Sequence, residues 1–342
     1  MRARSAEIIH VYCSESVSKM VITGIGLLLP FADSMERLIG ALKRGSLAAG
    51  DMPMPELGPG HGLVSTNSIT KKAYAAMMGA LSESRNAAVE ETETGVFLGN
   101  AFGSLRTMND LQETITEDRR RSAMPIDFMN SVMNAVAGQL AILGGCAGMN
   151  LTLSTGSRAS FDALCYARYM LEIGRVRSAV AGGVEEMNDV YAMYIRQNGA
   201  VPSDGACMFT VERRADAQSR GARIYAELTG SAAGYKPGFD KTDVKRIMEN
   251  AAHDAGLELS DIDFVVKSGS DAEADISQPS LDIKQVTGET YGASAAIAVA
   301  AAVAVCGEGI MPDGRKLRDE TKHVMINSFG FDGFMGSMIL NI

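Results

Sequence analysis

Hydrophobic positions in this chain gather into short apolar runs separated by longer segments of helical character. The runs at 21–26, 95–99, 179–183 and 203–212 are nearly continuous and show no alternation with polar residues. Such runs are typical of strands whose sheet is covered on both faces. Helices are expected between them, including 34–43 and the amphipathic segment 243–255. Strands that alternate with helices predict a layered α/β fold.

One apolar run, residues 293–305, has the composition of a membrane segment. It is too short to span a bilayer, and glycines flank it. We interpret it as a fully buried core helix, so no membrane association is expected.

A strand, a small-residue turn and a helix follow one another at residues 150–164. Ser157 lies in the turn, at the start of the helix. Unpaired N–H groups and the helix dipole favour negative charge there. Enzymes often place a nucleophile or an oxyanion at such a position, so Ser157 is the first candidate site residue.

Composition narrows the function classes. The chain has 342 residues, 46% of them hydrophobic, and a net charge of −9, which argues against nucleic-acid binding. Its five cysteines form no Cys-x-x-Cys pair, so neither a metal site nor a disulfide framework is expected, and no cofactor is implied. Residues 1–19 lack a signal-peptide core and are interpreted as an extension or as the product of an upstream start codon. A cytoplasmic protein is expected.

The order of motifs resembles the β-ketoacyl synthase family. The segment 150–160 resembles its nucleophile turn, usually Ser-Thr-Ala-Cys-Ala-Ser, and residues 327–333 (Asn-Ser-Phe-Gly-Phe-Asp-Gly) are close to its Asn-Ser-Phe-Gly-Phe-Gly-Gly loop. Five further landmarks occur in the family's order between Val21 and Glu212. The resemblance implies the thiolase fold, with two similar halves stacked as α-β-α-β-α. The expected divisions are an extension (1–19), an N-terminal half (20–219) and a C-terminal half (220–342).

The same resemblance assigns the family's Cys-His-His catalytic positions to residues that cannot play those roles unaided. Ser157 stands at the cysteine position, and Ser268 and Glu289 stand at the two histidine positions, while Lys284 retains the frame of the second motif. None of the chain's four histidines matches a catalytic position. A serine needs a neighbouring base to act as a nucleophile, and a carboxylate at 289 would repel a malonyl carboxylate and its enolate.

Three further residues are assigned to the cavity or its gate: Arg158, Phe329 and Phe331. We hypothesise that Arg158 pairs with Glu289 and fills the space of an acyl chain. We also expect the backbone N–H groups near Ser157 and Phe331 to remain available as an oxyanion site, because such a site needs no particular side chain.

Several functions fit these residues. The first is a chain-length-factor-type subunit, which resembles a ketosynthase, lacks the catalytic cysteine and forms a heterodimer with an active ketosynthase and its acyl carrier protein. The second is a serine-dependent acyltransferase or hydrolase that uses Ser157 on acyl-carrier-protein thioesters. The third is a non-enzymatic homodimeric binding protein. The sequence leaves open the product, the partner and whether Ser157 is ever acylated.

Overall fold

The computed structural model describes residues 19–57, 65–84, 93–116, 124–317 and 321–342. Within them, ten strands form one sheet in the order β3-β2-β4-β5-β1-β6-β10-β9-β7-β8. The strands are β1 (Met20–Leu28), β2 (Thr94–Gly99), β3 (Asn150–Leu153), β4 (Ser178–Glu185), β5 (Gly205–Arg213), β6 (Ala226–Tyr235), β7 (Phe264–Lys267), β8 (Ser280–Asp282), β9 (His323–Phe329) and β10 (Phe334–Asn341). Of the predicted extension 1–19, only Lys19 belongs to the described residues.

The sheet consists of two groups of five strands with the same internal order. The first group runs β3-β2-β4-β5-β1, and the second runs β8-β7-β9-β10-β6. A short antiparallel pairing joins them, in which Met20 of β1 lies opposite Leu228 of β6 and Ile22 opposite Ala226. The predicted boundary at residue 219 coincides with the end of the helix that separates β5 from β6. That this boundary divides the protein into two similar halves stays a prediction.

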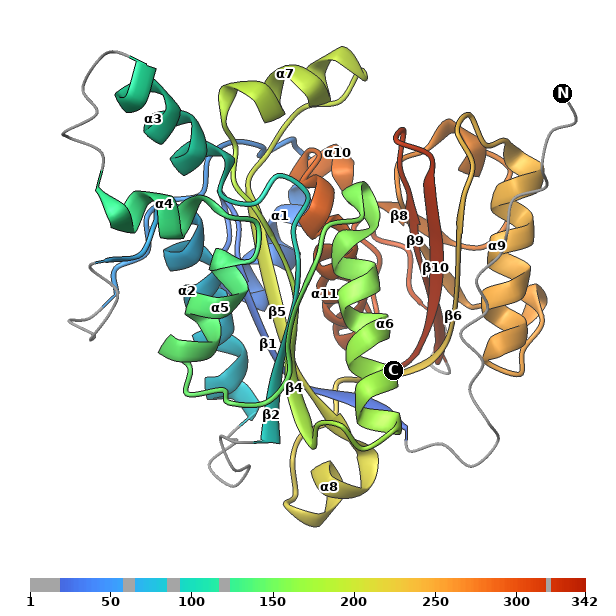
Figure 1. The fold of residues 1–342 in the computed structure, drawn as a ribbon. Coiled ribbons are helices and arrows are strands. Elements are labelled where there is room, and N and C mark those ends of the chain that lie inside the picture. The colour runs from blue at the N-terminus through green and yellow to red at the C-terminus, as the bar shows by residue number, and fades with distance from the viewer. Residues whose placement is uncertain (1–18, 58–64, 85–92, 117–123, 318–320) are drawn as a thin grey trace, which may run out of the picture.

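Helices cover both faces of both groups (Figure 1). α2 and α5 pack on the outer face of the first group, α6 and α11 lie between the groups, and α9 covers the outer face of the second. The resulting order of layers is the α-β-α-β-α arrangement that the family resemblance implied. The helices are α1 (Met35–Arg44), α2 (Ser68–Ser84), α3 (Leu105–Thr116), α4 (Pro125–Ser131), α5 (Ala135–Leu143), α6 (Ala159–Glu172), α7 (Asp189–Gln197), α8 (Arg214–Ser219), α9 (Lys241–Asp254), α10 (Lys284–Thr287) and α11 (Ser294–Glu308).

Neighbouring residues of a strand contribute to different cores, which explains the absence of polar alternation. In β2, Phe97 belongs to the core between the two strand groups, whereas Val96 and Leu98 belong to the core under α2 and α5. Since both faces are buried, apolar residues are required at every position.

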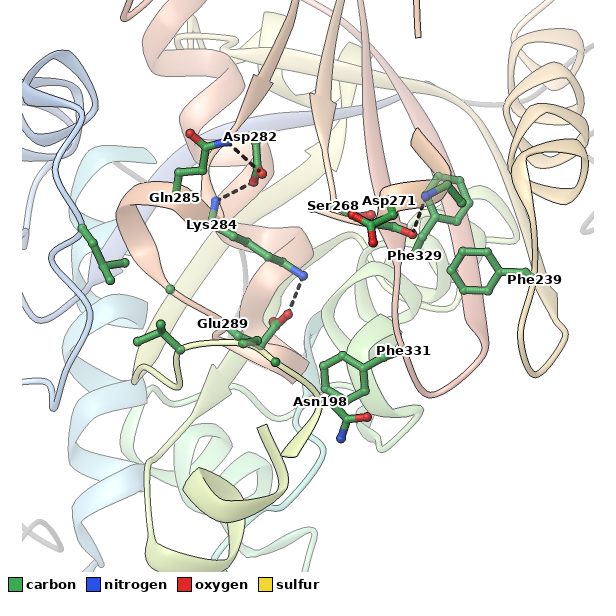
Figure 2. A pocket seen from close by; sticks show the side chains of 18 of the residues that line it. Asn198, Phe239, Ser268, Asp271, Asp282, Lys284, Gln285, Glu289, Phe329 and Phe331 are labelled. Carbon is green, nitrogen blue, oxygen red and sulfur yellow. Dashed lines mark hydrogen bonds and ion pairs between the residues drawn. The ribbon is translucent and has the colours of Figure 1, made fainter. Parts of the chain in front are cut away.

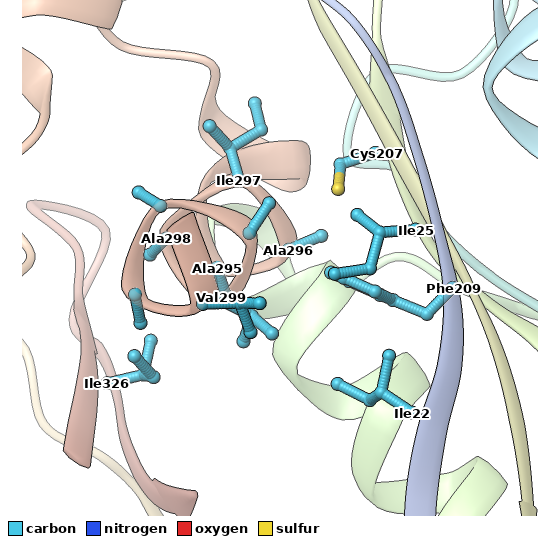
Figure 3. Packing of buried hydrophobic residues seen from close by; sticks show 14 of the residues in the cluster. Ile22, Ile25, Cys207, Phe209, Ala295, Ala296, Ile297, Ala298, Val299 and Ile326 are labelled. Carbon is cyan, nitrogen blue, oxygen red and sulfur yellow. The ribbon is translucent and has the colours of Figure 1, made fainter. Parts of the chain in front are cut away.

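The predicted core helix lies at the centre of the molecule. Figure 3 shows α11 between Ile22, Ile25 and Phe209 of the first strand group and Ile326 of the second. Together with the preceding turn, it is the one unbroken helix among the described residues that is long and apolar enough to cross a membrane. However, 83% of the segment Tyr291–Glu308 is buried within the protein. Its apolar character is therefore explained by packing on all sides.

Two glycines of β1 let α2 approach the sheet at backbone distance. A Cβ atom at Gly24 would lie 2.0 Å from the carbonyl oxygen of Ala80, and one at Gly26 would lie 1.9 Å from that of Ala76. Any side chain there would push α2 away from the sheet. The glycines in the 21–26 motif are thus explained by close helix–sheet packing.

Candidate functional site

Ser157 lies in the single 3₁₀ turn Gly156–Arg158, between β3 and α6. Gly156 makes the turn possible with a φ of +55°, a conformation that L side chains rarely adopt. The predicted strand–turn–helix is thus confirmed. Ser157 is only 4% exposed, so the candidate nucleophile is almost inaccessible to solvent.

Asp332 is the direct partner of Ser157. One carboxylate oxygen accepts the backbone N–H of Ser157 at 2.8 Å, and the other accepts its hydroxyl at 2.8 Å. The phenol of Tyr291 and the N–H of Phe334 donate to the same carboxylate at 2.8 and 3.2 Å. Four donors therefore converge on one side chain that comes from the loop between β9 and β10.

This arrangement corrects the expectation that the oxyanion site at Ser157 remains available. An oxyanion or a thioester carbonyl oxygen would need the N–H of Ser157, but that N–H is already bound by a carboxylate. The negative charge of Asp332 would also repel a second anion at short range. The expectation was wrong because it considered backbone donors alone and ignored a side chain that could satisfy them.

Ser268, at the first histidine position, is part of a separate buried network. Its hydroxyl donates to Glu273 at 2.6 Å, and its N–H donates to the same carboxylate at 2.9 Å. Asn327 donates to Glu273 as well, at 2.8 Å. Burial raises the pKa of Glu273, which is 1% exposed, and these hydrogen bonds partly offset that effect. Ser268 is therefore engaged in holding a structural carboxylate.

Glu289, at the second histidine position, forms an ion pair with Lys284. The Lys284 ammonium lies 2.6 Å from the Glu289 carboxylate. Figure 2 marks this contact with a dashed line. The other carboxylate oxygen accepts the N–H of Tyr291 and the hydroxyl of Ser294, both at 2.8 Å. The carboxylate is thus fully used in charge pairing and in fixing the start of α11.

The hypothesised pair between Arg158 and Glu289 is wrong. The Arg158 guanidinium contacts Asp162, one helical turn further along α6, at 3.0 Å. It also donates to the carbonyl oxygens of Gly234 and Met335 at 2.9 and 3.1 Å and lies over the ring of Phe334. A local partner at i+4 and two strand carbonyls therefore hold Arg158, and it lines neither of the cavities near Ser157.

Two cavities of very different size lie near these residues. The larger, about 770 Å³, is lined by Ser268, Lys284 and Glu289 together with Phe329 and Phe331. The smaller, about 10 Å³, is the one that Ser157 lines, with Ser268, Lys284 and Phe329. It has room for about one water molecule. The structure thus brings most predicted site residues together, but it separates Ser157 from the open space.

Aromatic rings pack around Tyr291, one of the donors to Asp332. Phe331, 40% exposed, stacks on Tyr291 with ring centroids 5.6 Å apart and contacts Tyr194 edge-on. Tyr291 has a φ of +43°, a conformation unusual for a residue with a side chain, while its hydroxyl donates to Asp332. Phe331 is therefore packed onto a residue that holds Asp332, and its role as a gate stays a prediction.

Sequence reasoning missed Asp332, Glu273 and Tyr291. The signal for Asp332 was present, because an aspartate stands where the resembled loop has a glycine. Glu273 and Tyr291 had no comparable signal. No metal-binding group is formed in the described ranges, since no three His, Cys, Asp or Glu side chains converge there.

Comparisons with known proteins agree with the geometry. Residues 64–216 match the family model "Beta-ketoacyl synthase, N-terminal domain". The chain is 25% identical to 3-oxoacyl-[acyl-carrier-protein] synthase 2 of Vibrio harveyi over 410 aligned positions, which cover 95% of this chain and 98% of the relative. Because 410 exceeds the 342 residues present, the alignment necessarily opens gaps in this chain.

Solved structures share the fold. The ishigamide ketosynthase/chain length factor superposes with a TM-score of 0.83 and 18% identity, covering 95% of this chain and 99% of that one. A type II PKS acyl-carrier protein in complex with its ketosynthase gives a TM-score of 0.80 and 17% identity, with the same coverage. Residues 64–216 thus carry the N-terminal domain of the beta-ketoacyl synthase family, and over nearly its whole length the chain is similar to members of that family.

Proposed function

We propose that this chain is a non-catalytic, chain-length-factor-type subunit that pairs with an active ketosynthase in fatty-acid or polyketide biosynthesis. The observation that carries the proposal is the contact between Asp332 and Ser157, in which a carboxylate occupies both the hydroxyl and the N–H of the nucleophile position. The ion pair of Glu289 with Lys284 supports it, because neither group is an imidazole that could stabilise an enolate.

The proposal predicts that the purified chain forms no acyl-enzyme. The experiment is incubation with an acyl-carrier-protein thioester and malonyl-carrier protein, followed by intact-mass measurement of the chain and analysis of the products. No mass increase and no two-carbon extension are expected. A stable adduct that disappears in Ser157→Ala would instead support the serine-dependent acyltransferase or hydrolase. Extension of the thioester would overturn both ideas.

The serine hypothesis has one specific observation in its favour. Asp332 lies 2.8 Å from the Ser157 hydroxyl, so a base is present that the sequence reading did not assign. Against it, the same carboxylate occupies the N–H that would stabilise an oxyanion, and the hydroxyl opens only onto a cavity of about 10 Å³. Asp332→Gly removes the base and frees the N–H together. Loss of acylation in this variant would mark Asp332 as a base, whereas new acylation would mark it as a block.

Association with a partner subunit is supported by an apolar face next to the edge of the sheet. β3 is the last strand of the sheet order, and an unpaired edge is a common place for a second chain to add. Exposed apolar side chains occur on α4, α5 and α6, directly after α6 and just before β3: Phe128, Met129, Ile142, Met149, Tyr166, Tyr169 and Ile173. Exposed groups of this kind are typical of protein interfaces.

The partner is tested by co-expression with an active Cys-His-His ketosynthase. A heterodimer in solution, with activity supplied by the partner's cysteine and its acyl carrier protein, is expected. Ile142→Glu, at a position 76% exposed, should weaken the heterodimer without unfolding the chain. A stable homodimer that does not bind the ketosynthase would favour the hypothesis of a non-enzymatic binding protein. The proposed location is the cytoplasm.

A further inference from the structure

Glu185, the last residue of β4, is a buried carboxyl that holds a neighbouring loop. It is 0% exposed. One carboxylate oxygen accepts the backbone N–H of Ala101 at 2.8 Å, and the other accepts that of Phe102 at 3.0 Å. Both donors come from the loop that follows β2. Two hydrogen bonds to one carboxyl therefore fix this loop against the end of β4.

The same carboxyl lies against a 3₁₀ turn, Tyr291–Ala293, which directly precedes α11 and is called the Tyr291 turn below. A Cβ atom added at Gly292 would lie 2.5 Å from a carboxylate oxygen of Glu185 and 2.8 Å from the backbone nitrogen of Ala101. Only glycine fits there, because any side chain would collide with both groups. The loop after β2 and the Tyr291 turn therefore meet at Glu185.

The Tyr291 turn connects Glu185 to the candidate nucleophile. Tyr291 has a φ of +43°, which is unusual for a residue with a side chain, and its hydroxyl donates to Asp332 at 2.8 Å. Asp332 in turn accepts the N–H and the hydroxyl of Ser157. A displacement of the turn would withdraw one donor from Asp332, and the remaining hydrogen bonds of this network would weaken.

Among the described residues, Glu185 takes part in no ion pair that could balance its charge. Lys72 of α2 forms ion pairs with Glu186 at 2.8 Å and with Asp204 at 3.0 Å. Its single positive charge thus already serves two carboxylates, which leaves this group of three with a net negative charge. The electrostatic surroundings therefore oppose a second anion at Glu185.

Two further titratable groups, Tyr191 and Glu289, face this region. Burial, followed by the charges of Glu289 and Glu185, raises the pKa of Tyr191 on α7, so this phenol stays neutral. Glu289 is paired with Lys284. For Glu185, burial raises the pKa from 4.5 to about 7, and the charge of Asp204 adds to this effect, whereas backbone N–H groups oppose it. A proton is therefore the counter-charge that Glu185 can take near neutral pH.

We propose that Glu185 is a proton-dependent latch on Ser157. With its proton bound, Glu185 keeps the loop after β2 and the Tyr291 turn closed. Loss of that proton to water favours an open state, in which the carboxylate is hydrated, the turn has moved away and Asp332 has lost the Tyr291 donor. The inference builds on the contact between Asp332 and Ser157 that also carries the proposed function, but it requires no reaction at Ser157.

The direction of the pH dependence follows from linkage. Opening exposes the carboxyl of Glu185 to water and returns its pKa from about 7 toward 4.5. Between these two values the open state has lost the proton while the closed state keeps it. Opening therefore becomes more favourable as pH rises, and the effect levels off above about 7.

The test is amide hydrogen exchange of the full chain from pH 5 to pH 7.5, read by mass spectrometry at single-residue resolution and corrected for intrinsic rates. We expect the protection of Ala101, Phe102 and Ser157 to fall about fiftyfold across this range and to stay below that of the β10 amides at each pH. Protection equal to that of β10 would mean exchange through global unfolding alone and would overturn the proposal. Protection that does not change with pH, or a fall that does not reach Ser157, would overturn it as well.

Glu185→Gln cannot ionise, so the protection of the same three amides should no longer depend on pH, whatever its level. Glu308→Gln is the matched control, because it removes one negative charge from an exposed pair with Lys43, and it should keep the full slope. A slope that persists in Glu185→Gln, or that disappears in Glu308→Gln, contradicts the latch. Amide exchange reports opening and intact mass reports acylation, so the latch and the proposed function can fail separately.

Discussion

Three carboxylates, those of Asp332, Glu273 and Glu289, bind the polar groups around the three positions that the sequence resemblance assigns to catalytic residues. Asp332 binds Ser157, Glu273 binds Ser268, and Glu289 is itself the residue at the second histidine position. Each accepts several hydrogen bonds, and each serves a different strand end or turn. At the scale of single residues, the site is therefore built to be stable, with its polar groups already satisfied.

Asp332→Asn should lower stability. Ser157 and Tyr291 donate to one oxygen of Asp332, and Ser157 and Phe334 donate to the other. An amide nitrogen cannot accept, so the backbone N–H of one pair loses its partner, at a cost of about 1–3 kcal/mol, while the hydroxyl of that pair can accept from the amide instead. Urea unfolding measures this cost. Asp313→Asn, in an exposed pair with Arg315, is the control and should change little.

A double-mutant cycle should locate the partner of Glu289. Lys284→Met and Glu289→Gln are expected to couple by about 1–3 kcal/mol, because the two groups form a short, largely buried ion pair. Arg158→Met and Glu289→Gln should show no coupling, since the guanidinium is bound to Asp162 instead. The free energies of unfolding of the single and double variants provide the measurement. Coupling in the second cycle would contradict the observed pairing.

The stability of the protein should fall as pH rises from about 4.5 to about 7 because of Glu185. Burial raises the pKa of this carboxyl from 4.5 to about 7, although N–H groups of Ala101 and Phe102 bind it. In that window the unfolded state loses the proton and the folded state keeps it, so rising pH favours unfolding.

The difference between the two pKa values corresponds to about 3 kcal/mol. Glu185→Gln cannot ionise, and its unfolding free energy should therefore lack this part of the slope. Urea unfolding at a series of pH values compares the two proteins. Parallel pH curves would show that folding leaves the pKa of this carboxyl unchanged.

At the scale of elements, the closeness of α2 to β1 determines which glycines tolerate change. Gly26→Ala would place a Cβ 1.9 Å from the Ala76 carbonyl oxygen, and we expect a loss of about 3 kcal/mol in unfolding free energy. Gly138, inside α5, has nothing within 4 Å of its added Cβ. Gly138→Ala should instead stabilise by about 0.5–1 kcal/mol. Equal effects at the two glycines would mean that backbone entropy, and not helix–sheet contact, explains Gly26.

At the scale of the whole molecule, the layered fold could be predicted well from the sequence, because each strand is indicated by one contiguous run of apolar residues. The run 95–99 became β2, the segment 150–164 became β3, a turn and α6, and 293–305 became α11. The site was predicted less completely. Ser157, Ser268 and Glu289 could be assigned from motifs, but their partners depend on side-chain contacts. Asp332 lies 175 residues from Ser157. Arg158 forms its ion pair with Asp162, four residues away, and not with the distant Glu289.

The middle layer of α6 and α11, which both strand groups share, determines how the protein unfolds. α11 follows β6 to β8 in the chain but packs on α1, α6 and β5, and Ser160 of α6 accepts the N–H of Ala296 in α11 at 3.2 Å. Neither group of five strands can therefore complete its own core. Calorimetry should give a single cooperative transition, and a fragment ending at residue 219 should not fold by itself. Two separate heat-absorption peaks would mean that the halves are independent folding units, despite the sheet that runs through both.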